Sequence, residues 1–481
     1  MIRLHDVGPF TAQPLMAHRK IAHFAVIAIL IPLVMGLAGR VHAGSVPQLE
    51  ARFLELTQAL RAQPAQVLAK LFPETSFPLQ STPLFQTLAV LGMPRFVVHE
   101  ALTRTAENTL NTLLEKAQAG EVSFDIPPLA VRLADHGYPS VETGEIIAAL
   151  TFRNFVQPEV AAEAIFRDVL SKELSTLDLR QKVLLNPHVR DIGLSCRATK
   201  LTVNGVVQNA YVLVVESASH VLHSVELHLF KELNRWRQSP GTGLFPVLLS
   251  TLTGNSAPVD LEPVPVVVWD PKLYEQARVL GMGALLPDGT VPEPTEPELS
   301  AWAPILPVLH ASIPLDVSMG LDHVVAALWQ ALLIEEARRW ATEVGPCALS
   351  STALGGALHV FLRTGEDGTL FLDAAFYAAA PTHTWRLGSR LAGSVSTIEL
   401  PEQAFGKVQE VRLVSVATQA LKASALVDLS GGFSLLTPEP LYPPFSPYEL
   451  VIVDGAGREV LKHPLPLGLD GGFVEVVTGH D

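Results

Sequence analysis

The segment ADHGYPSVETGEIIAAL, residues 134–150, places an imidazole, a phenol and a carboxylate close together in the sequence. His136 lies nine residues before Glu145, and Glu145 follows Gly144 at the start of an apolar run. Imidazoles and carboxylates are the side chains that most often bind divalent metals or transfer protons in enzymes. The segment therefore raises the question of whether Glu145 belongs to a working site or is the remnant of one.

Other patterns of known chemistry are absent from the sequence. It contains no Gly-x-Ser-x-Gly elbow, P-loop, dinucleotide fingerprint or His-Glu-x-x-His. The two cysteines, Cys196 and Cys347, form no Cys-x-x-Cys pair, so a structural zinc site is unsupported. Buried free thiols are the favoured state, and a Cys196–Cys347 disulfide is the alternative. His220 and His223 have the spacing of helical neighbours, which predicts a solvated helix end.

The composition is that of a folded protein with several domains. The chain has 481 residues, of which 48% are hydrophobic and 17% charged, and this length suggests about three domains. A formal net charge of −14 gives no electrostatic support for binding nucleic acid. The 37 prolines and the low charge indicate apolar packing joined by ordered loops.

The N-terminal region has the pattern of a signal peptide. A basic stretch at residues 18–20 precedes a largely apolar run over residues 21–37, and residues 41–43 form a small-x-small cleavage pattern. We predict a signal peptide over residues 1–43, with Met16 favoured as the start. The alternative is an uncleaved anchor, for which the apolar run is short. The predicted location is therefore secreted or periplasmic, with no stable membrane anchor after cleavage.

Four segments in the first half of the chain resemble four in the second half, in the same order. Each pair shares the pattern of an amphipathic helix or an apolar strand. The pairs begin at Phe53 and Leu229, Arg95 and Pro265, Val160 and Val324, and Asn209 and Thr369. The offset falls from 176 to 160 residues, as loop deletions in the second copy would cause. We predict a duplication, with domain 1 at residues 44–217 and domain 2 at residues 218–385.

After about residue 386 the helical patterns stop, and apolar and polar residues alternate between Gly and Pro turns. This predicts a small all-β sandwich over residues 386–481, the C-terminal domain. Residues 427–435 together with 446–454 resemble the transthyretin-like, carboxypeptidase-regulatory type of β-sandwich.

Residues 50–217 resemble the CAP superfamily (cysteine-rich secretory proteins, antigen 5 and pathogenesis-related proteins) in its bacterial form. HGYPSVETGEIIAAL is similar to the family's Gly-Tyr and Gly-Glu-Asn-Ile-Ala motifs, and LLNPHVRDIGLSCRA is similar to its Leu-Leu-Asn-Pro-x-x-x-x-Ile-Gly-Val-Gly stretch. Arg132 falls where bacterial members carry an arginine. Domain 2 keeps weaker features, such as the Trp-Asp-Pro at Trp269. The resemblance implies an α/β (α+β) fold with two tandem α-β-α sandwiches ahead of the β-sandwich.

The resemblance also implies a cleft lined by two histidines and two acids, of which this chain keeps only part. Glu145 stands at the position of the first acid, and Asp168 at that of the second, on a helix. His136 is the candidate for the first histidine, and the alternative is an ordinary loop histidine. Arg180 occupies the position of the second histidine, and a guanidinium neither ligates a metal nor accepts a proton at neutral pH. We expect Arg180 to pair with Glu145 or Asp168 instead.

Domain 2 is predicted to have no such site, because Leu315 and Asp316 replace the Gly-Glu pair and Leu332 replaces the acid on the helix. We therefore interpret Glu145 as a remnant and predict no cofactor and no bound metal.

The favoured function is that of a non-enzymatic, extracytoplasmic binding or scaffold protein. The missing histidines in both copies and the added β-sandwich, a type often used for adhesion or positioning, support this prediction. The ligand stays open among lipid, glycan, cell-wall fragment and protein, and nucleic acid is excluded. The alternative is a metal-dependent or acid–base hydrolase that uses Glu145, Asp168 and His136.

Overall fold

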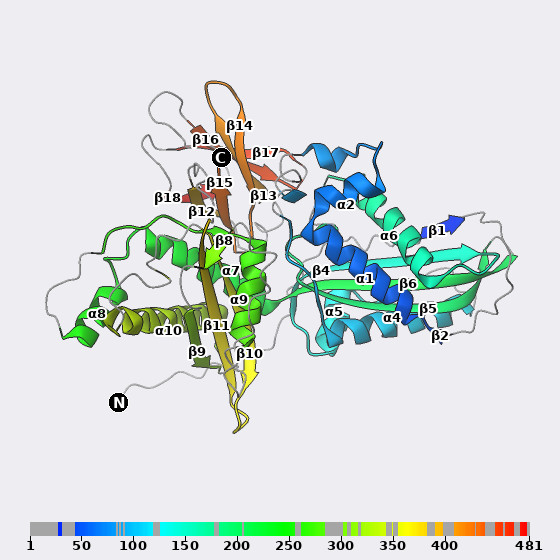
Figure 1. Ribbon diagram of the computed structural model, residues 1–481, viewed down its shortest axis with the longest axis horizontal. Coiled ribbons are helices and arrows are strands. Elements are labelled where there is room, and N and C mark those ends of the chain that lie inside the picture. Colours follow the sequence, from blue (N-terminus) through cyan, green and yellow to red (C-terminus); the bar gives the residue numbers. More distant parts are fainter. Residues whose placement is uncertain are drawn as a thin grey trace.

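The structure is a computed structural model in which mixed α and β content is confirmed (Figure 1). It describes residues 27–30, 44–82, 85, 88–89, 92–118, 126–177, 182–203, 206–254, 261–283, 302–304, 309–315, 319–342, 349, 355–381, 390–397, 408–428, 430–437, 448–455, 457–465 and 472–478.

Domain 1 is built on one mixed sheet. Its strands are β1 (Ile27–Leu30), β2 (Gly44–Ser45), β3 (Val97–Val98), β4 (Ser140–Phe152), β5 (Asp191–Val203) and β6 (Val206–His220). The order is β1-β4-β6-β5-β2, and β3 also pairs with β5. The long strands β4, β6 and β5 are antiparallel to one another, whereas β3 is parallel to β5. These apolar strands form the middle of the domain.

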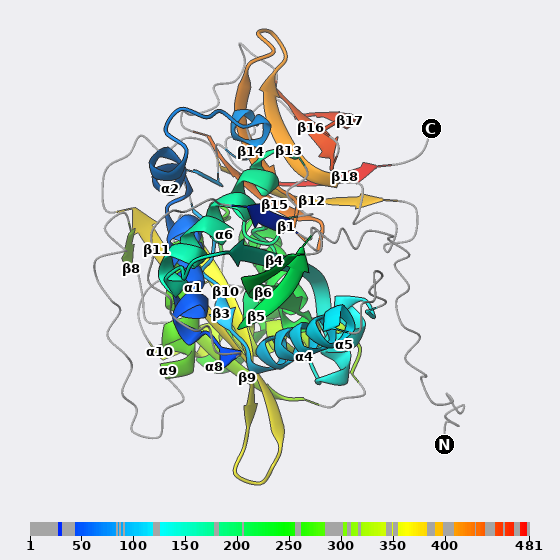
Figure 2. The ribbon, with the colours of Figure 1, turned by 90° about the vertical axis from the view of Figure 1, so that its right-hand side faces the viewer.

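Helices cover both faces of this sheet (Figures 1 and 2). They are α1 (Pro47–Ala62), α2 (Pro64–Leu71), α4 (Glu100–Gln118), α5 (Leu129–Asp135) and α6 (Pro158–Leu174), with a short 3₁₀ turn η1 (Pro78–Ser81). Successive residues of a strand point to opposite faces. Ile146 packs in the core beneath α1 and α6, and Ile147 packs in the core beneath α4. Domain 1 is therefore a three-layer α-β-α arrangement.

Domain 2 repeats the strand order of domain 1. Its strands are β7 (Val268–Trp269), β8 (Trp302–Pro304), β9 (Leu309–Pro314), β10 (Gly355–Thr364) and β11 (Leu370–Pro381). Their order is β7-β10-β11-β8, and β9 also pairs with β11. As with β3 and β5, β7 is parallel to β10, while β10–β11 and β11–β9 are antiparallel. Order and direction thus match β3-β5-β6-β4.

The helices of domain 2 follow the same plan on the described residues. They are α7 (Val221–Arg237), α8 (Leu244–Thr253), α9 (Pro271–Gly283) and α10 (Leu321–Thr342). Helices α7, α8 and α10 share one core with the sheet, and α9 packs on the opposite face.

A side-chain contact near the N-terminal helix of each domain is also repeated. The amide of Gln58 exchanges two hydrogen bonds with the backbone of Phe96, at 2.6 and 2.9 Å. The amide of Asn234 does the same with the backbone of Val267, at 3.0 and 2.8 Å. Each pair ties the first helix of its domain to the segment that leads into the short parallel strand.

Buried positions also fix the alignment of α6 with α10. Buried Ile165, Phe166 and Val169 of α6 recur as Leu328, partly buried Trp329 and Leu332 of α10. The offset is 163 residues, one fewer than the sequence comparison gave. Asp168 therefore corresponds to Ala331, which corrects the predicted match with Leu332.

The C-terminal domain consists of two facing sheets, consistent with the predicted β-sandwich. One sheet has the order β15-β12-β18 and the other β14-β13-β16-β17. The strands are β12 (Arg390–Thr397), β13 (Val408–Ser415), β14 (Leu421–Leu426), β15 (Gly432–Leu436), β16 (Tyr448–Asp454), β17 (Glu459–Pro464) and β18 (Gly472–Thr478). Leu391 and Phe433 of one sheet share a core with Leu413 and Ile452 of the other.

The predicted boundary at residue 217 falls inside β6, which continues to His220 before α7 begins. The boundary at 386 lies outside the described residues. Within the predicted signal peptide only β1 is described, as a strand parallel to β4. None of the helices in the described ranges is long and apolar enough to cross a membrane.

Candidate functional site

Arg132 of α5 is the centre of a charged cluster in domain 1. Its Nη2 donates to Glu145 Oε1 at 2.7 Å, and its Nη1 donates to Glu216 Oε1 at 2.6 Å. Its Nε donates to the carbonyl oxygen of Pro127 at 2.9 Å. One guanidinium is therefore shared by two carboxylates and fixed by the backbone.

The sheet brings the two carboxylates together. Glu145 of β4 and Glu216 of β6 are direct cross-strand partners, and both belong to the face covered by α4 and α5. Thr109 of α4 donates to Glu216 Oε1 at 2.9 Å and accepts a hydrogen bond from Arg132. The cluster thus joins two strands and two helices.

Gly193 explains how α4 comes close enough to take part. It is the β5 partner of Glu216, and a Cβ at this position would lie 2.2 Å from the backbone carbon of Leu102 in α4. Any side chain here would push α4 away from the sheet. Gly193 of the Ile-Gly motif therefore allows α4, the helix that carries Thr109, to pack close to the sheet.

Burial makes Glu216 the most perturbed group of the cluster. Its side chain is fully buried, and its Oε2 atom has no hydrogen-bond partner among the residues that the structure describes. Burial raises the pKa of Glu216 to about 7; the charge of Arg132 and the hydrogen bond from Thr109 oppose this shift, and the nearby Glu145 adds to it. Glu145 and Arg132 are less buried, with 19% and 12% of their side chains exposed. The site therefore holds one cation and two carboxyl groups, of which Glu216 can take up a proton near neutral pH.

The structure separates the predicted site residues. Glu145 lies in the cluster, whereas His136 is exposed at the end of α5, with its Nε2 3.2 Å from Nδ2 of Asn108, the residue before Thr109. Asp168 lies on α6, across the sheet from Glu145, and pairs with Lys172 at 3.0 Å on the helix surface. The expectation that Glu145 and Asp168 share a cleft is therefore wrong, because α6 covers the opposite face. Arg180 lies outside the described residues, so its predicted ion pair stays a prediction.

Sequence reasoning missed Glu216, Thr109 and the role of Arg132. The arginine had been noted only for its position. A usable signal exists for Glu216, since it interrupts an apolar strand, VLVVESA, in which a buried charge needs a partner.

Domain 2 has a different residue at the position of Glu216. The shared strand pairings make Ala357 the counterpart of Gly193, and the partner of Ala357 is Tyr377. The backbone N–H of Leu315 donates to the carbonyl oxygen of Leu370. Leu370 begins β11, whereas Tyr377 lies seven residues further along the strand. The prediction that Leu315 and Asp316 occupy the Gly-Glu position is therefore wrong for Leu315, and Asp316 lies outside the described residues.

A second polar cluster, buried at the junction of domains 1 and 2, is centred on Glu226 of α7. His223 Nδ1 lies 2.9 Å from Glu226 Oε2. His359 Nδ1 lies 2.9 Å from Oε1, which also accepts from the Val360 N–H at 2.9 Å and the Tyr274 hydroxyl at 3.2 Å. Burial opposes the ionisation of Glu226, but the hydrogen bonds from His223 and His359 outweigh it and lower its pKa to about 2.

Arg190, just before β5, brings domain 1 into this cluster. Its guanidinium lies 4.8 Å from the ring centre of Trp269 and 4.7 Å from that of Tyr274, and its Nη2 is 3.4 Å from His223 Nε2. The prediction of a solvated helix end at His220 and His223 is therefore wrong. His220 caps α7 by accepting from the Leu222 N–H, and His223 is only 5% exposed.

Two further findings bear on the chemistry of the described residues. They include no group of three or more His, Cys, Asp or Glu side chains that could hold a metal ion. Cys196 is a buried free thiol, and burial raises its pKa.

Comparisons with protein-family models, with curated proteins and with solved structures gave no match.

Proposed function

We propose that this chain is an exported, non-enzymatic binding or scaffold protein built on two degenerate CAP-like domains. The observation that carries the proposal is the pairing of Glu145 and Glu216 with the single guanidinium of Arg132. A carboxylate held in this way belongs to a structural ion pair, because the guanidinium of Arg132 already supplies the positive charge that a bound metal would supply.

The repeated architecture supports the duplication and the CAP-like assignment. Both domains share strand order and strand directions, and both keep the amide-to-backbone contact made by Gln58 and Asn234. The three-layer arrangement of domain 1 is the one that the sequence resemblance implies.

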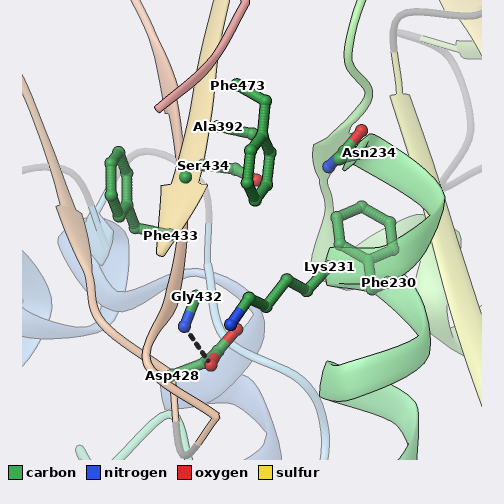
Figure 3. A pocket seen from close by; sticks show the side chains of 10 residues that line it. Phe230, Lys231, Asn234, Ala392, Asp428, Gly432, Phe433, Ser434 and Phe473 are labelled. Atoms are coloured by element: carbon green, nitrogen blue, oxygen red, sulfur yellow. Dashed lines mark hydrogen bonds between the residues drawn. The ribbon is translucent and has the colours of Figure 1, made fainter. Parts of the chain in front are cut away.

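The position of α7 supports a scaffold function, because this one helix contacts all three parts of the chain. At its C-terminal end Arg235 pairs with Glu475 of the C-terminal domain and lies 5.5 Å from the ring centre of Phe473. Figure 3 shows the amine of Lys231 pointing toward the carboxylate of Asp428 across a small hollow between α7 and the sandwich. Contacts with one helix hold the three domains in a defined relative arrangement, which a scaffold requires.

One observation favours the alternative, an acid–base or metal-dependent hydrolase. Glu216 has a pKa of about 7 and lies beside Glu145, and His136 follows Arg132 by four residues at the end of α5. A carboxyl group of this kind is suited to general acid catalysis.

Calorimetric titration with Zn²⁺ and Ca²⁺ separates the two functions. We expect no saturable, stoichiometric heat from the full chain, because Arg132 already neutralises Glu145. Asp168→Asn is the matched control, since it removes a carboxylate from the opposite face of the same domain. Tight binding that disappears in Glu145→Gln and persists in Asp168→Asn would overturn the proposal in favour of the hydrolase.

Export is tested by the N-terminus of the protein recovered from outside the cytoplasm. Cleavage after Ala43 removes β1 and leaves β2, at Gly44, as the first element. We therefore expect intact-mass spectrometry to find a chain that begins at Gly44. Recovery of the full-length chain in the cytoplasmic fraction alone would contradict the proposed secreted or periplasmic location.

A further inference from the structure

The side chain of Arg190 crosses the junction between domains 1 and 2. The guanidinium of Arg190 is buried and lies close to the aromatic faces of Trp269 and Tyr274. Within the described residues, its Nε and Nη1 atoms have no hydrogen-bond partner. Within the same residues, the contact from Nη2 to His223 is therefore the one polar contact of this guanidinium across the junction.

The hydrogen-bond pattern determines which nitrogen of His223 carries the proton. Glu226 is ionised and can only accept hydrogen bonds, so His223 donates to it from Nδ1. The Nε2 atom of neutral His223 then carries a lone pair, and it accepts a hydrogen bond from Nη2 of Arg190 at 3.4 Å. Neutral His223 thus links Glu226 of domain 2 to Arg190 of domain 1.

A second proton on His223 can bind only at Nε2. It would place an N–H group and a positive charge against the guanidinium of Arg190, which has no acceptor to offer. Burial already lowers the pKa of His223; Arg190 lowers it further, and Glu226 raises it. His223 is therefore neutral at neutral pH and becomes charged only in acid.

Charged and titratable groups from each neighbouring element face this contact. They are Glu226 on α7, His359 on β10, Tyr274 and Glu275 on α9, Asp191 beside Arg190 on β5, and Arg61 on α1. The charges of Glu226, Glu275 and Asp191 favour the cation of Arg190. Burial of the site opposes any second cation, since a desolvated like-charge pair is costly.

We propose that the junction is an acid-operated joint: protonation of His223 at Nε2 breaks its contact with Arg190, displaces the guanidinium from its position against Trp269 and Tyr274, and lets domains 1 and 2 separate. The inference adds regulation to the proposed scaffold. Its test involves neither ligand nor activity, so its failure leaves the proposed function standing.

Small-angle X-ray scattering of the full chain between pH 7.5 and pH 4 tests the joint. We expect the radius of gyration to rise by roughly a tenth in acid, as two bodies separate while each stays compact. Emission from Trp269, obtained as the difference between the wild type and Trp269→Phe, is expected to shift to the red over the same pH range. Far-ultraviolet circular dichroism is expected to stay unchanged.

Two variants identify the group that titrates. His223→Gln keeps a donor for Glu226 and an acceptor for Arg190 but cannot take up a proton, so its expansion should move down by about one pH unit or disappear. His359→Gln is the matched control, because His359 bonds to the same carboxylate without touching Arg190, and it should expand like the wild type.

Three results would overturn the joint. They are a constant radius of gyration down to pH 4, the same acid response in His223→Gln as in the wild type, and loss of secondary structure at the pH of expansion. The last result would show global acid unfolding in place of domain separation.

Discussion

Replacing Arg132 by alanine is expected to destabilise domain 1 by about 3–5 kcal/mol, which is the usual effect of leaving buried carboxylates without their cation. Arg132 is the ion-pair partner of both Glu145 and Glu216, and Glu216 is fully buried. The substitution also leaves the carbonyl of Pro127 without the N–H of Arg132. Few single changes in this domain leave as much uncompensated charge behind.

The loss should depend on pH in a defined direction. Glu216 has a folded-state pKa raised to about 7, so it prefers the protonated form in the folded chain, and removing Arg132 strengthens that preference. An unfolded carboxyl ionises near its ordinary value. The folded variant therefore loses stability as the pH rises from the unfolded pKa through the folded one. The destabilisation by Arg132→Ala should be larger at pH 8 than at pH 5.5.

Denaturant titrations of single and double variants measure this coupling. Arg132→Ala combined with Glu216→Gln should be more stable than Arg132→Ala alone at pH 8, because no charge is left buried at residue 216. Glu55→Gln is the control, since Glu55 pairs only on the surface of α1 with Arg52. Additive effects of Arg132→Ala and Glu216→Gln, or no loss in the single variant, would show that the cluster does not form.

The architecture could be predicted because it depends on periodic patterns. Apolar residues at helical spacing predicted α1, α6, α7 and α10, and alternating apolar residues predicted the strands of the C-terminal domain. The alignment within a repeat was less secure, because helices with similar apolar spacing match almost equally well when shifted by one residue. The match between α6 and α10 was wrong by one position for this reason.

The composition of the site was harder to predict, because it depends on which residues of a sheet face one another. Glu145 and Glu216 are 71 residues apart in the chain and become neighbours only through the pairing of β4 with β6. Asp168 has the right residue type but lies on the wrong side of the sheet. His223 was placed in solvent because the helix start was recognised, whereas the approach of Arg190 from another domain leaves no local pattern.

Arg61, at the C-terminal end of α1, is the second residue whose replacement is expected to destabilise domain 1 strongly. Its guanidinium is fully buried and donates to the carbonyl oxygens of Pro94, Leu184, Asn186 and Val189. Burial lowers its pKa to about 9, which leaves it charged at neutral pH. It joins the C-terminal end of α1 to the segment before β3 and to the loop before β5.

We expect Arg61→Met to destabilise domain 1 by roughly 4 kcal/mol or more, since four carbonyl groups lose a charged donor and each unsatisfied buried group costs about 1–3 kcal/mol. Methionine keeps most of the apolar volume, so the variant removes the hydrogen bonds without opening a large cavity.

The matching strand order of the two domains supplies a matched comparison for this test. Arg237 ends α7 as Arg61 ends α1, is fully buried, and donates to the carbonyl oxygens of Pro265 and Leu349. Arg237→Met should therefore destabilise domain 2 in the same way, and denaturant titration with hydrogen exchange of each domain would assign the two losses. Equal or greater stability in both variants would mean that desolvation of the guanidinium outweighs its hydrogen bonds. A loss in Arg61→Met alone would mean that only domain 1 depends on this contact, and that the two arginines are not equivalent parts of a repeated fold.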